Sequence, residues 1–333
     1  MPAQIPVIDV AQFLSANELD RARVVRQVRQ ALEEVGFLTI AGHGVPEELI
    51  ERVSKASLDF FDKPEDYKAR HVIPGHPNRG YGAMRSRTVG ITQDPTLRKS
   101  LQEGFGIGLI ERPKDPSYTD EASGGQFVAN VFPDDPADFE PALCEYYAHM
   151  QRLFRTIMRM FAVALELRQD YFEPMLTHAA NTVRLTHYPA LDEPPEEGEQ
   201  RAGAHTDTGT LTILHIDDTP NSLQVETRSK EWIYVNRVPG TFVINIGDLM
   251  MRWTNDKWVS NMHRVVNPPF INGRSAGRLS IVCFCSVNSD TLVECLPNCS
   301  GPGNPPRYAP IRSGEYQAMR VATRYGLKPP VAS

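Results

Sequence analysis

The stretch Arg278-Leu279-Ser280-Ile281-Val282-Cys283-Phe284-Cys285-Ser286 predicts a β-strand with two different faces. Side chains two residues apart on a strand point to the same face. One face carries Arg278, Ser280, Val282 and Phe284, and the other carries Leu279, Ile281, Cys283 and Cys285. The first face begins with polar residues and the second is apolar throughout, so we expect the polar face to look into the interior of a barrel.

Other short strands are expected around this one in the second half of the chain. Alternating or apolar runs bounded by turn residues predict strands at residues 182–188, 211–216, 241–246 and 258–266. Several short strands in succession are typical of a sandwich or a jelly roll. Apolar spacing predicts helices at residues 17–35, 46–61, 138–167 and 313–325, and two strands are expected at residues 5–10 and 36–40.

The composition is that of an ordinary soluble globular protein and argues against several classes. The 333 residues are 41% hydrophobic and 23% charged, which allows a sizeable core. A net charge of -6 without a basic stripe argues against a nucleic-acid partner. No apolar run reaches the length of a membrane helix, and residues 1–6 lack the regions of a signal peptide. We therefore expect a cytoplasmic protein with no membrane partner, and the sequence leaves the oligomeric state open.

The cysteines allow two interpretations. They are Cys144, Cys283, Cys285, Cys295 and Cys299. An odd number of cysteines without a signal peptide favours reduced thiols. The spacing of the last four also fits zinc ligands. We favour a buried role, because Cys283 and Cys285 lie in an apolar strand and cysteine often behaves as a small buried hydrophobe.

Two histidines and one aspartate form the strongest candidate for a metal site. His205 and Asp207 are two residues apart, so at a strand end they point to one side. His263 follows in another strand-like run, and a jelly roll brings such distant strands face to face. Two imidazoles and one carboxylate leave coordination positions open, which suits non-haem iron(II) and oxygen better than a closed structural zinc site.

Arg278 and Ser280 indicate what fills some of these open positions. An unpaired charge inside a barrel is costly, so Arg278 needs an anionic partner. A dicarboxylate such as 2-oxoglutarate supplies one, because its distal carboxylate accepts a two-pronged contact from Arg278 and a hydrogen bond from Ser280. Tyr188 is a candidate for a further donor to this carboxylate.

The remaining histidines fit a metal site less well. His215 is the obvious rival ligand, but it lies in mid-strand with no carboxylate two residues before it, so we expect a structural role. His71 and His76 lie in a charged loop, and we expect both to be solvated. His187 neighbours Tyr188 on the opposite face of a strand, so it should point away from the metal.

Short motifs that are typical of one protein family occur along nearly the whole chain. The first half contains Ile5–Asp9, Gly36–Ile40, Gly42–Val45, and Phe60–Phe61 with Pro64. The second half contains Arg184, Tyr188–Pro189, His205–Asp207, Leu223–Val225, Asn245–Asp248, His263–Val265 and Arg278–Ser280. On these residues, the chain resembles the iron(II)- and 2-oxoglutarate-dependent dioxygenases of the isopenicillin N synthase-like family. It departs from the family at Asn221-Ser222, where Gly-Gly is frequent, and at Thr186, where Asn is frequent.

The resemblance implies an α+β fold, with a distorted double-stranded β-helix (jelly-roll) core and flanking helices. It implies a leading domain over residues 1–135. A long helix and the catalytic jelly roll would occupy residues 136–333, and the two parts would form one compact unit.

The resemblance also implies Fe(II), with 2-oxoglutarate as co-substrate and O2 as oxidant. His205, Asp207 and His263 would then be the metal ligands. Arg278, Ser280 and Tyr188 would then bind 2-oxoglutarate.

The implied activity is hydroxylation of a small-molecule substrate, or its desaturation or cyclisation, with 2-oxoglutarate converted to succinate and CO2. Candidate substrate contacts are Arg184, Phe284, Asn181, Phe105, Tyr81 and Thr208. Arg184 shares a strand face with Tyr188, so it is a candidate for binding a polar or anionic substrate, with a structural ion pair as the alternative. The run from Asn181 to Pro189 is similar to that of pyrimidine-hydroxylating members, but we carry no substrate over on that basis.

Two other hypotheses remain open from the residues. An iron-dependent oxidase of the same fold would not use 2-oxoglutarate, and Arg278 and Ser280 would then bind the carboxylate of its substrate. An inactive metal-binding or interaction module is the alternative from another class. The complete set of three ligands argues against an inactive module, because such a protein need not retain all of them.

Overall fold

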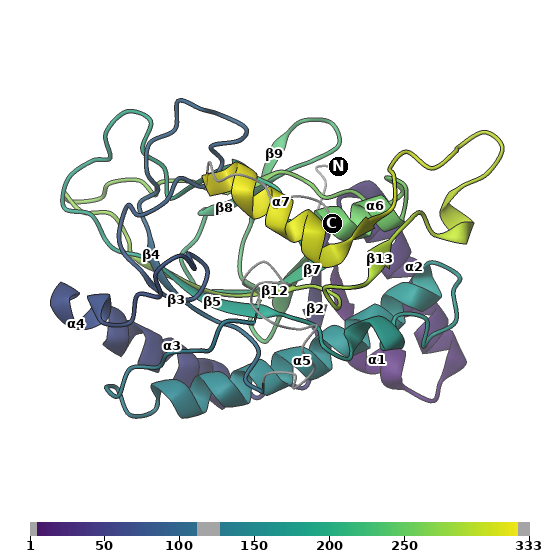
Figure 1. Ribbon diagram of the computed structural model, residues 1–333, viewed down its shortest axis with the longest axis horizontal. Coiled ribbons are helices and arrows are strands. Elements are labelled where there is room, and N and C mark those ends of the chain that lie inside the picture. The colour runs from purple at the N-terminus through teal and green to yellow at the C-terminus, as the bar shows by residue number, and fades with distance from the viewer. Residues whose placement is uncertain (1–4, 112–126, 326–333) are drawn as a thin grey trace.

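An eight-stranded sheet forms the centre of the structure (Figure 1). The computed structural model describes residues 5–111 and 127–325. Residues 1–4, which belong to the segment expected to lack the regions of a signal peptide, lie outside the described part. In spatial order the sheet contains β1 (Val7–Asp9), β2 (Phe37–Ala41), β10 (Phe242–Ile246), β7 (Leu211–Ile216), β12 (Arg278–Cys285), β5 (Thr182–Tyr188), β4 (Glu103–Ile107) and β3 (Gly80–Gly82). Neighbouring strands are antiparallel except for the parallel pair β1 and β2.

A smaller sheet and seven α-helices complete the described fold. The small sheet contains β6 (Ala202–His205), β11 (His263–Val265), β8 (Leu223–Glu226) and β9 (Trp232–Val235), and a separate pair contains β13 (Leu292–Val293) and β14 (Ile311–Arg312). The helices are α1 (Val10–Leu14), α2 (Glu18–Glu34), α3 (Glu47–Phe61), α4 (Glu65–Ala69), α5 (Phe139–Ala164), α6 (Asp248–Trp253) and α7 (Ser313–Tyr325). Two short 3-10 turns cover Glu173–Leu176 and Pro297–Cys299. None of the helices in the described ranges is long and apolar enough to span a membrane.

Local hydrogen bonding and backbone geometry explain where α2, the helix expected at residues 17–35, begins and ends. The Asn17 side chain accepts a 3.0 Å hydrogen bond from the backbone N–H of Leu19 and so caps the start of α2. Gly36 follows α2 with φ +70°, a conformation that glycine adopts without strain. A Cβ atom at Gly36 would lie 2.2 Å from the carbonyl oxygen of Val259, so no larger residue fits there.

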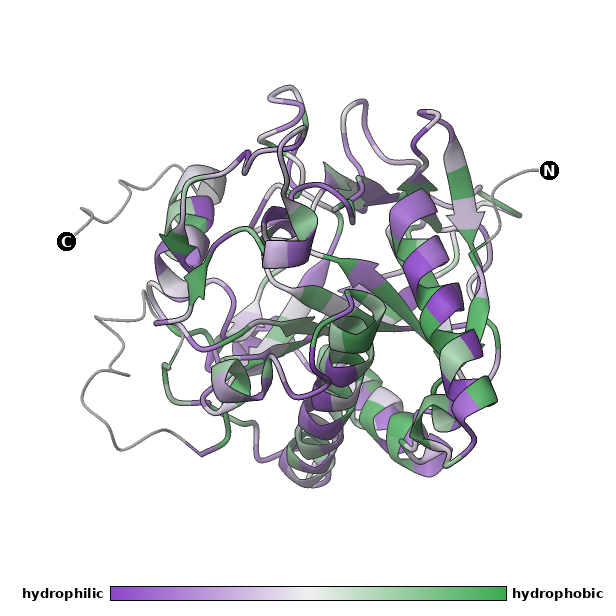
Figure 2. Ribbon diagram, turned by 90° about the vertical axis from the view of Figure 1, so that its right-hand side faces the viewer, coloured by the Kyte–Doolittle hydropathy of each residue, from purple (hydrophilic) through white to green (hydrophobic). Residues whose placement is uncertain are grey.

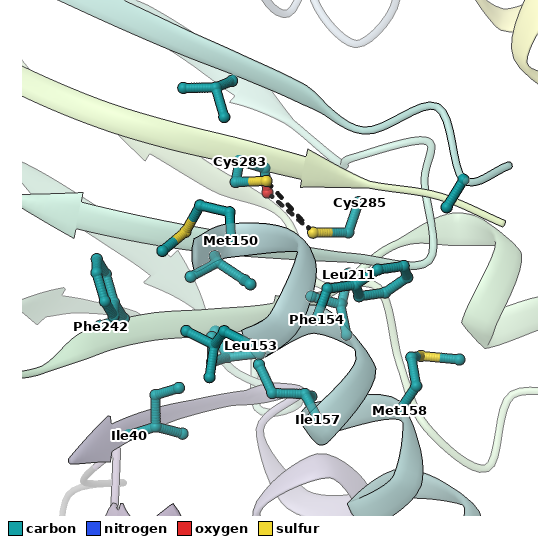
Figure 3. Packing of buried hydrophobic residues seen from close by; sticks show 14 of the residues in the cluster. Ile40, Met150, Leu153, Phe154, Ile157, Met158, Leu211, Phe242, Cys283 and Cys285 are labelled. Atoms are coloured by element: carbon teal, nitrogen blue, oxygen red, sulfur yellow. Dashed lines mark hydrogen bonds between the residues drawn. The ribbon is translucent and has the colours of Figure 1, made fainter. Parts of the chain in front are cut away.

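The large sheet has a helix-facing side and a side that faces the small sheet. α3 and α5 run along the helix-facing side (Figure 1). α5 places Met150, Phe154 and Ile157 against this side, where Cys283 and Leu211 also lie (Figure 3). The helices carry both hydrophilic and hydrophobic residues (Figure 2), as amphipathic helices on a core do. This packing buries every second side chain of the central strands.

The opposite side of the large sheet packs towards the small sheet. Tyr188, Leu214 and Val243 of the large sheet share a second apolar cluster with Val225 and Val265 of the small sheet. Two sheets face each other and helices cover one outer side, so the expectation of an α+β jelly-roll fold is confirmed. The large sheet draws strands from both halves of the chain, because β1 to β4 precede residue 135.

The expected strand at residues 258–266 is wrong over most of its length. Only His263–Val265 is a strand. Trp258 instead donates its backbone N–H to the Thr254 hydroxyl at 3.2 Å, and its ring packs on Phe161 with centroids 5.1 Å apart. Asn261 donates from its side chain to the carbonyl oxygen of Val35. These contacts hold the segment in an irregular path before β11 begins.

The expectation that His71 is solvated is also wrong. Its side chain is buried beside Phe60 and Tyr67, with ring centroids 5.8 and 5.2 Å apart. The charged sequence around it indicated a surface loop, but Phe60 of α3 covers the ring together with Tyr67, which lies four residues earlier in α4. The cysteines do behave as expected: all five are free, and Cys283 and Cys285 are fully buried.

Candidate metal centre and its cavities

His205, Asp207 and His263 come together at one edge of the small sheet. His205 of β6 is the direct antiparallel partner of His263 of β11, and their ring centroids are 4.3 Å apart. Asp207 lies two residues beyond the end of β6, and its Oδ1 is 3.8 Å from Nε2 of His263. One donor atom from each of the three residues lies within 4.8 Å of the other two. The arrangement is suited to hold a single metal ion.

Backbone carbonyl groups orient both imidazole rings. Nδ1 of His205 lies 2.8 Å from the carbonyl oxygen of Gly203, and Nδ1 of His263 lies 3.3 Å from that of Asn261. A carbonyl oxygen only accepts hydrogen bonds, so each Nδ1 carries a proton. Nε2 is therefore the nitrogen that each ring can offer to a metal, through the lone pair that it presents when the ring is neutral.

The Asp207 carboxylate is fixed by two neighbours. Its Oδ2 accepts a 2.5 Å hydrogen bond from the Thr212 hydroxyl and a 2.9 Å hydrogen bond from the Asn245 amide. Burial opposes ionisation of Asp207, but nearby His263 and His205 and these two hydrogen bonds together hold its pKa below the ordinary value. The carboxylate is therefore ionised near neutral pH and its Oδ1 is left for a metal.

A cavity of about 620 Å³ lies between the two sheets, and we call it the intersheet cavity. Large-sheet residues Tyr188, Arg278 and Ser280 line it, as do Ala202 and Leu223 of the small sheet. Arg278 and Tyr188 are direct partners in the pairing of β12 with β5. The cavity thus extends from the three metal-ligand candidates to a buried arginine.

Arg278 has polar neighbours but no ion pair with a described carboxylate. Its Nε donates to the Ser280 hydroxyl at 3.1 Å, its Nη1 donates to the Ser222 hydroxyl, and its guanidinium carbon is 5.8 Å from the centroid of the Tyr188 ring. Burial lowers the pKa of Arg278, while Tyr188 and Asp217 favour its charged form. A buried guanidinium whose neighbours are mainly hydroxyl groups fits a carboxylate ligand such as that of 2-oxoglutarate.

A second cavity, of about 880 Å³, lies beside α7, and we call it the α7 cavity. Gln317, Arg320 and Val321 of α7 line it, together with Thr208 and Gly209. Both cavities are lined by Arg87, Val89, Arg184, His205, Asp207 and Phe284. His205 and Asp207 therefore lie where a ligand of one cavity would meet a ligand of the other, and His263 lines the intersheet cavity.

The candidate substrate contacts divide into two groups. Arg184, Phe284 and Thr208 line one or both cavities. Phe105 and Tyr81 line neither of these cavities: Phe105 is the direct partner of Leu185 and of Tyr81, and all three point to the helix-facing side.

Asn181 does not line either of these cavities. Asn181 is fully buried, and its side chain links α5 to the end of β12. It donates to Oε1 of Gln151 at 2.8 Å and accepts from the backbone N–H of Ser286 at 3.0 Å. These hydrogen bonds occupy both ends of the amide, so Asn181 has a structural role.

Four residues of the site were not predicted from the sequence to have a role in it. Thr212 and Asn245 fix Asp207, Ser222 contacts Arg278, and Arg87 lines both cavities. Thr212 lies in the strand that follows the turn after Asp207, and its position on the cavity face follows from strand alternation. Arg87 belongs to the segment between β3 and β4, whose path has no periodic signal in the sequence.

His215 and His187 lie outside the candidate metal centre. His215 follows Leu214 on β7, so its side chain points to the helix-facing side and is buried near Phe242, with ring centroids 6.1 Å apart. Burial lowers the pKa of His215 to about 4. Nδ1 of His187 lies 2.8 Å from Oε1 of Glu103, again on the side away from the cavity.

Comparisons with known proteins agree on one family. Residues 5–134 match the family described as non-haem dioxygenase in morphine synthesis N-terminal, and residues 179–287 match the 2OG-Fe(II) oxygenase superfamily. The 2-oxoglutarate-Fe(II) type oxidoreductase hxnY of Emericella nidulans is 35% identical over 93% of this chain and 87% of its own. Homoarginine-6-hydroxylase 2-ODD-233 of Oryza sativa subsp. japonica is 31% identical over 96% of this chain and 97% of its own.

A crystal structure of a protein bound to alpha-KG is also similar to this chain. A full-length Neurospora crassa protein, crystallised in complex with alpha-KG and thymine, superimposes with a TM-score of 0.83 and 28% identity, covering 96% of each chain. That crystal structure therefore shares its fold with nearly all of this chain.

The first prediction concerns the hydroxyl that fixes Asp207. Thr212→Val should lower the affinity for Fe(II) about 10- to 100-fold, because loss of a residue that orients a metal ligand typically has this effect. Anaerobic titration calorimetry measures the affinity. Thr210→Val is the matched control, since the Thr210 hydroxyl is buried with no hydrogen-bond partner among the described residues. Equal affinities in the two variants would contradict the role of Thr212.

The second prediction concerns His215 and pH. The pKa of about 4 in the folded protein lies below the ordinary value of 6.5, so the unfolded chain binds an extra proton between these values. The stability that the neutral His215 contributes is present above pH 6.5 and is lost as pH falls towards 4. In metal-free protein, His215→Phe should flatten the dependence of unfolding free energy on pH by up to about 1.4 kcal/mol per pH unit in this window. Parallel curves for the two proteins in urea denaturation would contradict the prediction.

Proposed function

Because this chain belongs to the 2-oxoglutarate-Fe(II) oxygenase superfamily, we propose that it oxidises a carbon atom of a small organic molecule at the centre formed by His205, Asp207 and His263. It is an Fe(II)- and 2-oxoglutarate-dependent dioxygenase. Bound Fe(II) and 2-oxoglutarate supply oxygen activation, with succinate and CO2 as the products of the co-substrate. The observation that carries the proposal is the convergence of two imidazoles and one carboxylate in the intersheet cavity, with His205 and Asp207 also lining the α7 cavity.

In this proposal each of the three residues offers one atom to the metal. His205 and His263 would offer Nε2, because their Nδ1 atoms donate to backbone carbonyl groups. Asp207 offers Oδ1, because Oδ2 is engaged by Thr212 and Asn245. Three protein donors leave positions for a chelating co-substrate and for oxygen.

The intersheet cavity is the proposed site of 2-oxoglutarate. Arg278 would bind the distal carboxylate, and Ser280 would donate its hydroxyl hydrogen to the same group. Tyr188 lies next to Arg278 across the strand pair and would cover this end of the cavity. The support for this assignment is that Arg278 is buried with no described carboxylate in ion-pair distance, so an anion removes an electrostatic penalty there.

The α7 cavity is the proposed site of the substrate. Thr208 lines it directly after the metal-ligand candidate Asp207, and Arg184 and Phe284 line it at the junction of the two cavities. These side chains would orient the substrate and keep water from the reacting carbon. Among the relatives, an enzyme named as a hydroxylase favours hydroxylation as the outcome.

The test of this assignment separates 2-oxoglutarate binding from metal binding. Arg278→Gln should raise the dissociation constant of 2-oxoglutarate about 30-fold or more, since truncating one partner of a buried charge pair costs about 2 kcal/mol or more. Its affinity for Fe(II) should remain close to that of the wild-type protein. Anaerobic calorimetric titration measures both constants.

Arg274→Gln provides the matched control for this test. Arg274 precedes the same strand, is two-thirds exposed and pairs with Asp192 at 3.1 Å, outside both cavities. It should leave 2-oxoglutarate affinity unchanged. If Arg278→Gln also binds 2-oxoglutarate normally, the proposed co-substrate site is wrong.

A further inference from the structure

Arg87 lines both cavities and has no role in the assignments made so far. It lies in the segment between β3 and β4 and is partly buried. His205, Asp207 and Arg184 line the same junction of the two cavities. A charged group placed there would contact a molecule that lies beside the metal.

The contacts of Arg87 hold its guanidinium without neutralising it. Its Nη2 donates to Oε1 of Gln102 at 2.7 Å. The Gln102 side chain is buried and is itself fixed, because its Nε2 donates to the carbonyl oxygen of Arg201 at 2.8 Å. Nε of Arg87 is buried with no hydrogen-bond partner among the described residues. The guanidinium is therefore positioned by a neutral amide and retains donor capacity.

The neighbouring arginines of the same segment behave differently. Arg85 pairs with Glu199 at 2.8 Å, and Arg98 pairs with Glu196. Both of these arginines are about half exposed, and neither lines the two cavities. No described carboxylate lies within ion-pair distance of Arg87. Glu196 and Glu199 thus pair with the two outer arginines, and Arg87 is left directed to the cavities.

Arginine side chains outnumber carboxylate groups in the described linings of both cavities. In the described part of each lining, Asp207 is the sole carboxylate, and it is a metal-ligand candidate. Arg278 is assigned to 2-oxoglutarate, and Arg320 pairs with Asp248 at 3.1 Å. Arg184 adds positive charge at the junction, where Gly104 leaves room for it: a Cβ atom there would lie 2.6 Å from its Nη2.

We propose that the substrate carries a carboxylate group and that Arg87 binds this group at the junction of the two cavities, beside Arg184. The proposal rests on the proposed function, since it names the substrate class of the same site. A guanidinium offers two parallel N–H donors that match the two oxygens of a carboxylate. The same charge disfavours cationic substrates, because like charges in a site of low dielectric repel strongly.

The test compares each carboxylate with its neutral amide. The probes are butyrate, hexanoate, benzoate, cyclohexanecarboxylate and 3-phenylpropionate, each with its primary amide, and phenylphosphonate represents a dianion. Binding is measured without oxygen on protein saturated with Fe(II) and 2-oxoglutarate, so that Arg278 is already occupied. At least one carboxylate should bind about tenfold or more tightly than its amide, because hydrogen bonds to charged groups are stronger than neutral ones.

Two arginine variants assign the preference to a residue. Arg87→Gln should abolish the preference for the carboxylate and leave 2-oxoglutarate affinity unchanged. Arg85→Gln, the matched control two residues away, should retain the preference. Rescue of part of the preference by Arg87→Lys would support a role of charge at this position, because lysine keeps the charge but lacks the two-pronged geometry.

Several results would overturn the inference. They are the absence of any carboxylate preference in the wild-type protein, tighter binding of phenylphosphonate than of benzoate, and a preference that survives Arg87→Gln. Loss of 2-oxoglutarate binding in Arg87→Gln without a change in probe binding would assign the residue to the co-substrate and would also overturn it. Failure of the wild-type protein to bind 2-oxoglutarate would instead contradict the proposed function, so the two failures are distinguishable.

Discussion

The two-sided character of the central strands is the constraint on which the rest of the structure depends. Each strand of the large sheet must present one set of side chains to the helices and the other to the interior between the sheets. β12 places Ile281 and Cys283 in the helix-facing core and Arg278 and Ser280 in the intersheet cavity. A shift of one residue in the register of this strand would exchange these two sets. It would move a guanidinium into an apolar core and sulfur atoms into the cavity.

The small sheet provides the second half of the arrangement. Its strands are short, and the direct pairing of His205 with His263 brings together residues that are far apart in sequence. The large sheet then supplies Thr212 and Asn245 from neighbouring strands to hold Asp207. The candidate metal centre is thus built from both sheets, so its geometry depends on how the sheets face each other.

Burial and charge together determine which ions the interior favours. An exposed arginine with a glutamate partner, such as Arg85, contributes little to selectivity because solvent screens it. Buried Arg278 and partly buried Arg87 lack such partners among the described residues, so their charge is available to ligands. The interior is therefore organised to receive anions, although the whole chain carries a net charge of -6.

Much of the fold and of the candidate site could be predicted from periodicity and spacing. The boundaries of α2 and α7, the alternation of β12 and the grouping of His205, Asp207 and His263 all rest on local patterns. Strand register does not follow from such patterns, so the position of Phe105 opposite Leu185 on the helix-facing side of the sheet could not be predicted.

Tertiary contacts explain the other differences between sequence and structure. His71 is buried partly by Phe60 of α3, a contact that the charged residues around His71 do not indicate. Arg87 lies in a segment without periodicity, so its place between the two cavities could not be inferred. Such positions are set by contacts between distant parts of the chain rather than by local propensity.

A crystal structure of the protein with Fe(II) and 2-oxoglutarate, grown without oxygen, tests the central claim most directly. The account predicts one iron ion bonded to Nε2 of His205, Oδ1 of Asp207 and Nε2 of His263, with no fourth protein ligand. Iron at another location, or a fourth side chain that closes its coordination shell, would contradict the account.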